Sequence, residues 1–270
     1  MKRSKGQVMR GEVAAELVAG LFGLAMLALF LAVTSAVLLG ETAGVDAWLL
    51  RALRQVEEPA AIVGPRWVRD VAVTITTLGN NLTLLAAALT GLAWLFFRGD
   101  RRAQLVLLVV SIGGLLLNLA LKLGIDRPRP AVVPWLSSAD AWSFPSGHAM
   151  MTMVIFLALA VLIGRGIKDA RIRYILVAVA VTGSLATGAT RVMLGVHYPS
   201  DVFAGWLLAL GWCAACWLWD RRGREGRFAG TGRGGRGGRG EPYTKGGGSP
   251  DWLGLLRLAM TVGLGMGGSP

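Results

Sequence analysis

The stretch "SFPSGHAM" at residues 143–150, which leads directly into the apolar run "MTMVIFLALAVLIG" at residues 151–164, decides how the chain folds. From residue 148 onward this segment approaches the roughly 20 apolar residues that a membrane-spanning helix needs. Its polar start contains one of only two histidines among 270 residues. The sequence therefore predicts a membrane helix with a histidine, His148, at its polar N-terminal end.

The composition of the whole chain agrees with this prediction. Hydrophobic residues make up 54% of the sequence and charged residues only 16%, which excludes an ordinary soluble domain. A transmembrane β-barrel would show alternating segments of about 10 residues, and the sequence lacks them. We therefore predict an all-α, polytopic membrane protein.

Six apolar segments are candidates for membrane spans. Several are shorter than the roughly 20 residues of a full span, so we expect their ends to include polar residues or to lie within protein. The second segment has an alternative start near Val71. Together they predict a six-transmembrane-helix bundle with spans at 17–40, 82–97, 103–122, 148–164, 174–190 and 202–219.

Basic residues gather on one side of this predicted bundle. Most of the 28 Lys and Arg residues lie in the N-terminal segment, in the loops after the second and fourth spans, and in the tail. Because positively charged loops stay in the cytoplasm, we expect cytoplasmic termini in a cell (inner) membrane. Residues 143–150 then face the periplasm or exterior, and the net charge of +12 sets orientation rather than nucleic-acid binding.

The domain organisation follows from these segments. We predict a cytoplasmic N-terminus at 1–16, a six-helix membrane domain at 17–220, a disordered Gly/Arg-rich cytoplasmic tail at 221–250 and a short apolar segment without an assigned role at 251–270. The first span is too long for a signal peptide, so we expect it to be retained. Arg-Gly-Gly repeats in the tail suit RNA or anionic lipid, and we favour lipid.

Two further features have competing explanations. The segment 41–81 is partly amphipathic, with Trp48 and Trp67 among its apolar residues. It predicts either an interfacial helix or lid, or an extramembrane helix packed on the bundle. Cys213 and Cys216 form a C-x-x-C pair, but inside a membrane span we favour plain packing over a redox or metal role.

Three short stretches share the predicted outer side: "KLGIDRPRP" at 122–130, "PSGH" at 145–148 and "TRVMLGVHYPSD" at 190–201. Lys122, Arg129 and Arg191 would form a cluster of positive charge there. Such a cluster is unfavourable at a dry boundary unless a multiply charged anion lies among the cations. Arginine forks suit phosphate oxygens, so the cluster predicts phosphate binding.

The start of the fourth span supplies a second anion-binding element. Helix N-termini present unpaired backbone N–H groups and a positive dipole end. Gly147 lets an oxygen approach the backbone, and Ser146 adds a hydroxyl and is a candidate N-cap. We expect a phosphoryl group at this position.

The histidines supply the chemistry. His197 and Asp201 are four residues apart, a spacing that lets them meet on one helical face at the start of the sixth span, near Pro199. A carboxylate on one ring nitrogen leaves the other free to attack phosphorus, and His148 can protonate the departing oxygen. Taken singly, each residue also has an ordinary structural explanation, such as a snorkelling Lys122 or a helix-capping Asp201.

The sequence resembles the type 2 phosphatidic acid phosphatase family, which shares its site with vanadium haloperoxidases. The family's motifs are a Lys, six residues and Arg-Pro; Pro-Ser-Gly-His; and Ser-Arg, five residues, His, three residues and Asp. The resemblance covers residues 45–220, and the one departure, Thr190 for Ser, keeps a hydroxyl. The motifs read here as Lys122…Arg129-Pro130, Pro145-Ser146-Gly147-His148 and Thr190-Arg191…His197…Asp201.

This resemblance implies a six-helix membrane phosphatase that uses no metal and no cofactor. His197 would be the nucleophile that forms a phosphohistidine, Asp201 would orient it, and His148 would protonate the leaving group and then activate water. The remaining motif residues would hold the phosphoryl oxygens: Lys122, Arg129, Ser146, Gly147 and Arg191.

The expected substrate is a membrane lipid phosphate: phosphatidic acid, phosphatidylglycerol phosphate, a polyprenyl diphosphate or lipid A. Three alternatives stay open beside hydrolysis. They are phosphoryl transfer to another acceptor, haloperoxidase activity, and a non-catalytic protein that binds or transports an anionic lipid. The paired histidines favour catalysis over binding alone, and the sequence makes no prediction of oligomeric state.

Overall fold

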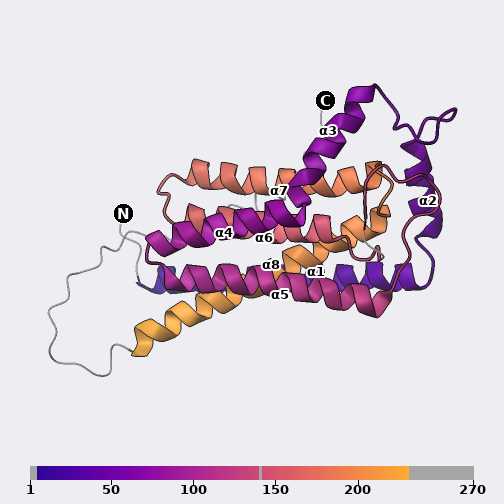
Figure 1. The fold of residues 1–270 in the computed structure, drawn as a ribbon. Coiled ribbons are helices and arrows are strands. Elements are labelled where there is room, and N and C mark those ends of the chain that lie inside the picture. The colour runs from indigo at the N-terminus through magenta and orange to yellow at the C-terminus, as the bar shows by residue number, and fades with distance from the viewer. Residues whose placement is uncertain (1–4, 140–141, 231–270) are drawn as a thin grey trace, which may run out of the picture.

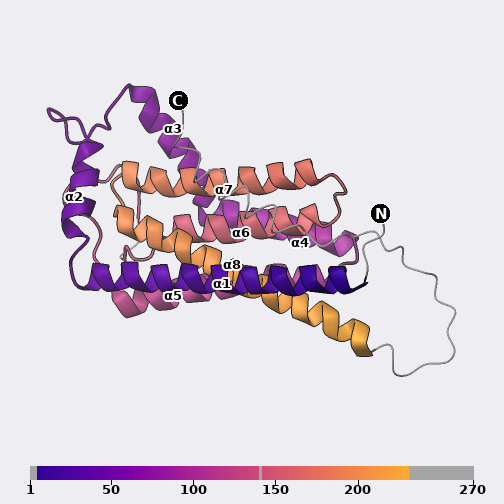
Figure 2. The same ribbon diagram turned by 180° about the vertical axis from the view of Figure 1, so that it is seen from behind.

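The chain is a bundle of long helices in the computed structural model, which describes residues 5–139 and 142–230, with side chains at 13–139 and 142–224. The long helices alternate in direction, α2 crosses one end of the bundle, and α3 leans away from it (Figures 1 and 2). The predicted all-α class is confirmed. The described elements are α1 (Lys5–Leu38), α2 (Ala43–Ala52), α3 (Arg66–Thr76), the 3₁₀ helix η1 (Thr77–Gly79), α4 (Asn81–Phe97), α5 (Arg101–Ile125), α6 (Gly147–Gly164), α7 (Ala170–Met193) and α8 (Pro199–Gly230).

The six expected spans are present among the described helices. Five helices are long and apolar enough to cross a membrane, and the bent pair Arg66–Gly79 and Asn81–Phe97 makes a sixth. The expected segment 17–40 overruns α1, which ends at Leu38 before Gly40 adopts a positive φ of 77°. The other five expected segments each lie inside one helix.

The second span is broken rather than continuous. Helices α3 and α4 meet at an angle of 47°, with η1 and Asn80 between them. The Asn80 side chain accepts a hydrogen bond of 3.1 Å from the Leu82 N–H, so it caps α4 and starts a new helix there. The alternative start near Val71 therefore describes the chain better than the start at 82.

Helix α2 packs on the end of the bundle where α8 begins. Asp46 and Leu50 are buried against it, whereas Trp48 points outward and is 66% exposed. For α2 this arrangement fits both alternatives, an interfacial helix and an extramembrane helix packed on the bundle. Helix α3 instead exposes Trp67 and Val71, and joins α4 as part of the broken span.

Helix α8 is longer than predicted. It continues through residues 221–230, where the sequence indicates the start of a disordered tail. The buried Asp220 accepts hydrogen bonds from Arg102 and Arg165, and Arg224 lies 3.2 Å from it. Ion pairs from neighbouring elements thus carry the helix past the end of its apolar run, while residues 231–270 lie outside the described residues.

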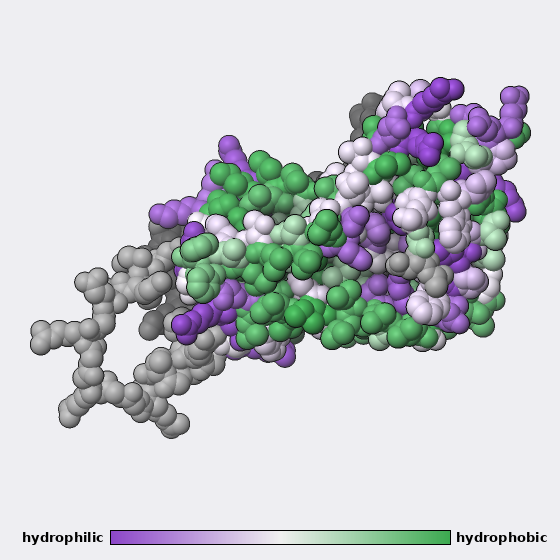
Figure 3. All heavy atoms as spheres, viewed as in Figure 1, coloured by the Kyte–Doolittle hydropathy of each residue, from purple (hydrophilic) through white to green (hydrophobic). Residues whose placement is uncertain are grey.

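Helix α6 occupies the centre of the bundle. It packs against α4, α5, α7 and α8, whereas α1 packs mainly on α8. Leucines on the outer faces, such as Leu85 and Leu116, stay exposed, and hydrophobic residues cover the middle of the bundle while hydrophilic residues gather toward its ends (Figure 3). Cys216 is buried in the core and Cys213 packs against it, both as free thiols, which agrees with the packing interpretation.

Close helix contacts depend on glycines that face tryptophans. A Cβ atom added at Gly188 in α7 would lie 2.5 Å from Cζ2 of Trp206 in α8. The Trp206 indole N–H also points at the Ser184 carbonyl, 3.4 Å away. The two helices therefore leave no room for a side chain at this point.

Gly188→Ala is expected to destabilise the bundle because the Trp206 ring must shift, at a cost of about 1–3 kcal/mol typical of overpacking. Gly183→Ala is the matched control on the same helix, since nothing lies within 4 Å of a Cβ atom there. Thermal unfolding in detergent should show a lower midpoint for the first variant and no loss for the second. Equal midpoints would contradict the close contact.

Candidate active site

All eight residues predicted for the site lie at one end of the bundle. Most of them are buried, and only Gly147 and His148 are partly exposed. Four helices and the turns between them supply these residues. They are Lys122 at the end of α5, Arg129 in the loop that follows, Ser146, Gly147 and His148 at the start of α6, Arg191 at the end of α7, His197 in the turn before α8, and Asp201 in the first turn of α8.

His197 and Asp201 form the centre of this group. The Nδ1 atom of His197 lies 3.4 Å from Oδ2 of Asp201, and the same oxygen accepts a 2.9 Å hydrogen bond from the Tyr198 N–H. His197 precedes α8, which begins at Pro199 as predicted, so the two side chains do not share a helical face. The turn before the helix brings them together instead.

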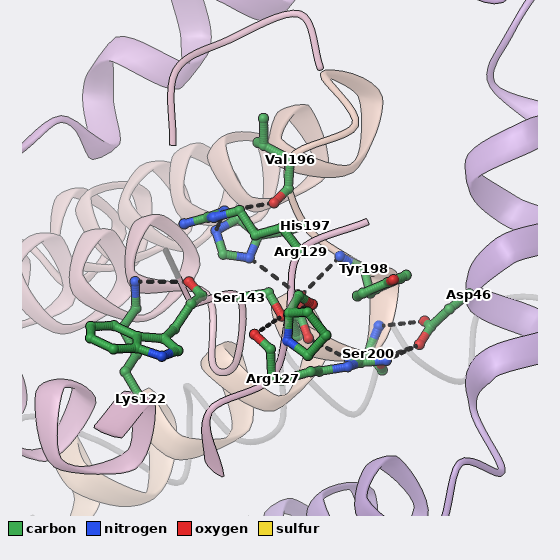
Figure 4. A network of polar contacts seen from close by, with 12 residues as sticks. Asp46, Lys122, Arg127, Arg129, Ser143, Val196, His197, Tyr198 and Ser200 are labelled. Atoms are coloured by element: carbon green, nitrogen blue, oxygen red, sulfur yellow. Dashed lines mark hydrogen bonds and ion pairs between the residues drawn. The ribbon is translucent and has the colours of Figure 1, made fainter. Parts of the chain in front are cut away.

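The His197 ring is neutral at neutral pH. Burial lowers its pKa to about 4, against the opposing effect of the Asp201 carboxylate, and the positive charges of Arg129 and Arg191 lower it further. With the Nδ1 proton directed at Asp201, Nε2 is unprotonated and its electron pair accepts from the Arg129 guanidinium until a phosphoryl group takes up that cation. Arg129 lies against this nitrogen, with its Nη1 atom 3.1 Å from Nε2 and 2.6 Å from the Val196 carbonyl (Figure 4).

The other two cations are held by oxygen atoms around the site. The Lys122 ammonium lies 3.4 Å from the Trp142 carbonyl. Arg191 donates to the Thr76 hydroxyl at 3.1 Å and to the Ser138 carbonyl at 3.4 Å. Since Thr76 ends α3, the segment between α1 and α4 reaches into the site.

The start of α6 provides a helix N-terminus and the side-chain hydroxyl of Ser146. Ser146 is the N-cap residue, as predicted, but its side chain makes no capping bond. Its backbone N–H donates to the Asp201 carbonyl at 3.0 Å, while its buried Oγ has no hydrogen-bond partner among the described residues. A buried hydroxyl of this kind is suited to an incoming anion.

His148 lies next to Gly79, the last residue of η1. A Cβ atom added at Gly79 would come within 2.8 Å of both His148 Cδ2 and Thr187 Cγ2. His148 also interacts electrostatically with His197, Lys122, Arg129 and Arg191. Its ring is therefore packed closely against Gly79, in the neighbourhood of the cations.

Four further buried or partly buried residues at this end of the bundle lie outside the predicted set: Asp46, Arg54, Arg127 and Ser200. Arg127 contacts Asp201 and also bonds to Asp46 and Ser200 (Figure 4). Arg54 donates to the Met193 carbonyl at 2.6 Å and so braces the turn that carries His197. Arg127 stood in a quoted basic stretch, whereas nothing in the local sequence around Asp46 or Arg54 indicated a role.

Comparison with known proteins identifies the family. Residues 103–225 match the model of the PAP2 superfamily. Phosphatidylglycerophosphatase B of Bacillus subtilis (strain 168) is 31% identical over 159 residues, which cover 57% of this chain and 76% of that protein. The chain belongs to the PAP2 superfamily.

Other PAP2 proteins extend the comparison. Lipid A 1-phosphatase of Rhizobium etli is 33% identical over 183 residues, which cover 57% of this chain and 69% of that protein. The crystal structure of a transmembrane PAP2 type phosphatidylglycerolphosphate phosphatase from Bacillus subtilis superposes with a TM-score of 0.67 at 26% identity. That match covers 74% of this chain and 96% of the other.

Membership confirms the class of enzyme that the motifs indicate. The chain is a multi-pass membrane phosphatase of a family of metal-independent enzymes. Among the side chains described at 13–139 and 142–224, no group of three or more His, Cys, Asp or Glu is gathered as a metal site requires.

Gly79→Ala is expected to lower kcat about tenfold to a hundredfold with little change in KM, because the added methyl group displaces the His148 ring and misplaced groups lose rate steeply. Gly44→Ala is the control in the same segment, since nothing lies within 4 Å of a Cβ atom there. Phosphate release by the purified variants checks both. A Gly79→Ala enzyme as fast as the Gly44→Ala enzyme would contradict the confinement of His148.

Proposed function

We propose that the chain hydrolyses a phosphate monoester or diphosphate of a membrane lipid through a phosphohistidine on His197. One observation carries this proposal. A neutral, buried imidazole has one nitrogen directed at Asp201 and the other against the Arg129 guanidinium, at the end of the bundle where the remaining motif residues gather. The proposed nucleophile and a phosphate-binding cation thus lie next to each other.

The first step transfers the phosphoryl group to the protein. The Nε2 electron pair of His197 attacks phosphorus while the bond to the leaving oxygen breaks, and His148, which takes up a proton when the phosphate dianion binds beside it, donates that proton to the leaving oxygen. Asp201 holds the Nδ1 proton and offsets the positive charge that forms on the phosphorylated ring. Such proton donation is typically worth about 10²–10⁴ in rate.

The second step returns the enzyme to its starting state. His148, now neutral, removes a proton from water, the water oxygen attacks phosphorus, and the bond from Nε2 to phosphorus breaks. The phosphoryl oxygens are held by cations and by the α6 N-terminus in both steps. The groups proposed for this role are Lys122, Arg129, Arg191, the Ser146 hydroxyl and the Gly147 N–H.

The proposed substrates are lipids whose phosphate reaches the outer end of the bundle. Phosphatidylglycerophosphatase B and lipid A 1-phosphatase are named for acting on such lipids, which supports this class for the present chain. Phosphatidic acid, phosphatidylglycerol phosphate, polyprenyl diphosphate and lipid A are the candidates. Phosphoryl transfer to another acceptor would use the same phosphohistidine, and an assay for phosphorylated acceptor separates it from hydrolysis.

A protein that only binds or transports an anionic lipid is the second candidate function. It needs the cations, but it has no use for the contact between His197 and Asp201 or for a proton donor opposite. These two features favour the phosphatase.

The proposed orientation places the site on the periplasmic or outer side of a cell membrane. Arg98, Arg101, Arg165 and Arg171 lie between the spans at the end opposite to His197, which supports a cytoplasmic location for that end.

Phosphate release by purified protein in detergent tests the function. Wild-type protein should release phosphate from at least one of the candidate lipids in the presence of EDTA, and His197→Ala should abolish release because no nucleophile remains. Matched labelling with a ³²P-lipid should trap a phosphorylated protein that forms in wild type and not in His197→Ala. Full activity of His197→Ala would overturn the nucleophile, and no release from any candidate lipid would overturn the substrate class.

Labelling of cysteines introduced one at a time tests the orientation. Val56→Cys lies in the loop after α2, where the native side chain is 97% exposed, and Arg171→Cys lies at the exposed start of α7. A membrane-impermeant maleimide should label Val56→Cys in intact cells and Arg171→Cys only after permeabilisation. Wild-type protein, with its partly buried Cys213 and buried Cys216, is the background control. The reverse pattern would invert the proposed topology.

A further inference from the structure

A buried ionic chain links helix α2 to His197. It begins at Asp46 in the first turn of α2 and passes to Arg127 in the loop after α5 (Figure 4). It ends at Asp201, whose carboxylate faces His197. Both carboxylates are almost completely inaccessible, with 1% of Asp46 and 0% of Asp201 exposed. Only Asp201 belongs to a PAP2 motif.

Arg127 connects the two carboxylates through different nitrogens. Its Nη2 atom lies 2.9 Å from Oδ2 of Asp46, and its Nη1 atom contacts Oδ1 of Asp201. The guanidinium also stacks on the Tyr198 ring, 4.2 Å from the centroid. Arg127 is therefore fixed in its plane and direction, and so is the Asp201 oxygen that it holds.

Ser200 joins the same chain at the start of α8. Its backbone N–H donates to Asp46 at 3.0 Å and its hydroxyl donates to Asp46 at 2.6 Å. Arg127 in turn donates to this hydroxyl at 2.8 Å. The helix that carries Asp201 is thus tied to α2 directly beside the site.

We infer that Asp46 and Arg127 are positioning residues for the reaction, which hold the Asp201 carboxylate and, through it, the His197 ring in line for attack on phosphorus. This inference rests on the proposed function of His197. It makes α2, which lies outside the three motifs, a part of the active site.

The charges explain why two carboxylates are needed. Arg127 alone would neutralise Asp201, and no net negative charge would remain to offset the positive charge on a phosphorylated His197 ring. Asp46 takes up the charge of Arg127, so that the chain of two carboxylates and one guanidinium keeps a net charge of −1. Buried charges act strongly on one another, so this balance reaches the reacting nitrogen.

Asp46→Asn removes that charge and keeps the shape of the side chain. We expect kcat to fall about tenfold to a hundredfold, the range typical of partners one step removed from the reacting group. KM should change less than about twofold, because the phosphate-binding cations stay in place. Asp70→Asn is the matched control, since Asp70 lies in the same segment with its side chain exposed on α3.

Orthovanadate separates positioning from a purely structural role. Vanadate adopts the five-coordinate geometry of phosphoryl transfer, so its inhibition constant reports how well the site fits the transition state. We expect inhibition of Asp46→Asn to weaken in parallel with kcat. A loss of kcat with an unchanged vanadate constant would mean only fewer folded molecules and would overturn the inference, as would a rate equal to that of Asp70→Asn.

Ser200→Ala decides the matter where Asp46→Asn does not fold. It removes one hydrogen bond to Asp46 and leaves all the charges, so kcat should fall about five- to tenfold with the same weakening of vanadate inhibition. Unchanged kcat or unchanged inhibition would overturn the inference. Failure of the proposed function gives a different result, since the wild-type enzyme would then be inactive or His197→Ala would retain activity.

Discussion

The end of the bundle that holds the proposed site depends on the burial of the Asp201 carboxylate. Its two oxygens are shared among the Tyr198 N–H, the His197 ring and Arg127, and its backbone carbonyl accepts from Ser146. One residue thereby joins α8, the start of α6 and the loop after α5. A buried carboxylate is tolerated only when it is bonded so completely, and removing one partner of a buried pair typically costs about 3–5 kcal/mol.

Helix α8 carries a second buried carboxylate with ionic partners toward its other end. Asp220 is also buried, and arginines from α5, from the loop after α6 and from α8 itself surround it. At about 1.5 Å per residue, the two aspartates lie about 28 Å apart along the helix, close to the roughly 30 Å of a hydrocarbon core. Ionic groups thus lie at both ends of the apolar part of the bundle. Within that part, neither lipid nor packed apolar side chains could stabilise them. The two ionic groups differ in that a histidine, His197, lies next to Asp201.

The sequence predicted the spans well because hydropathy depends on local composition, and it predicted the motif residues because their spacing is fixed within short stretches. The structure differs where contacts between distant segments decide. The extension of α8 beyond residue 220 rests on ion pairs with Arg102 and Arg165 that hydropathy does not register. Asp46 has no neighbour in the sequence that marks it, since its partners lie about 80 and 150 residues away. His197 meets Asp201 through a turn, although the spacing of four residues suggested a shared helical face.

The segment between α1 and α4 contacts the proposed site from outside the three motifs. It touches the site at three points: Asp46 bonds to Arg127, Thr76 accepts from Arg191, and Gly79 confines His148. The chemistry requires these three partners to keep fixed positions. The same segment also presents Trp48 and Trp67 on its exposed surface. The segment thus has an exposed aromatic side and a buried side that contacts the proposed catalytic groups, so substitutions on the first side are constrained by the contacts on the second.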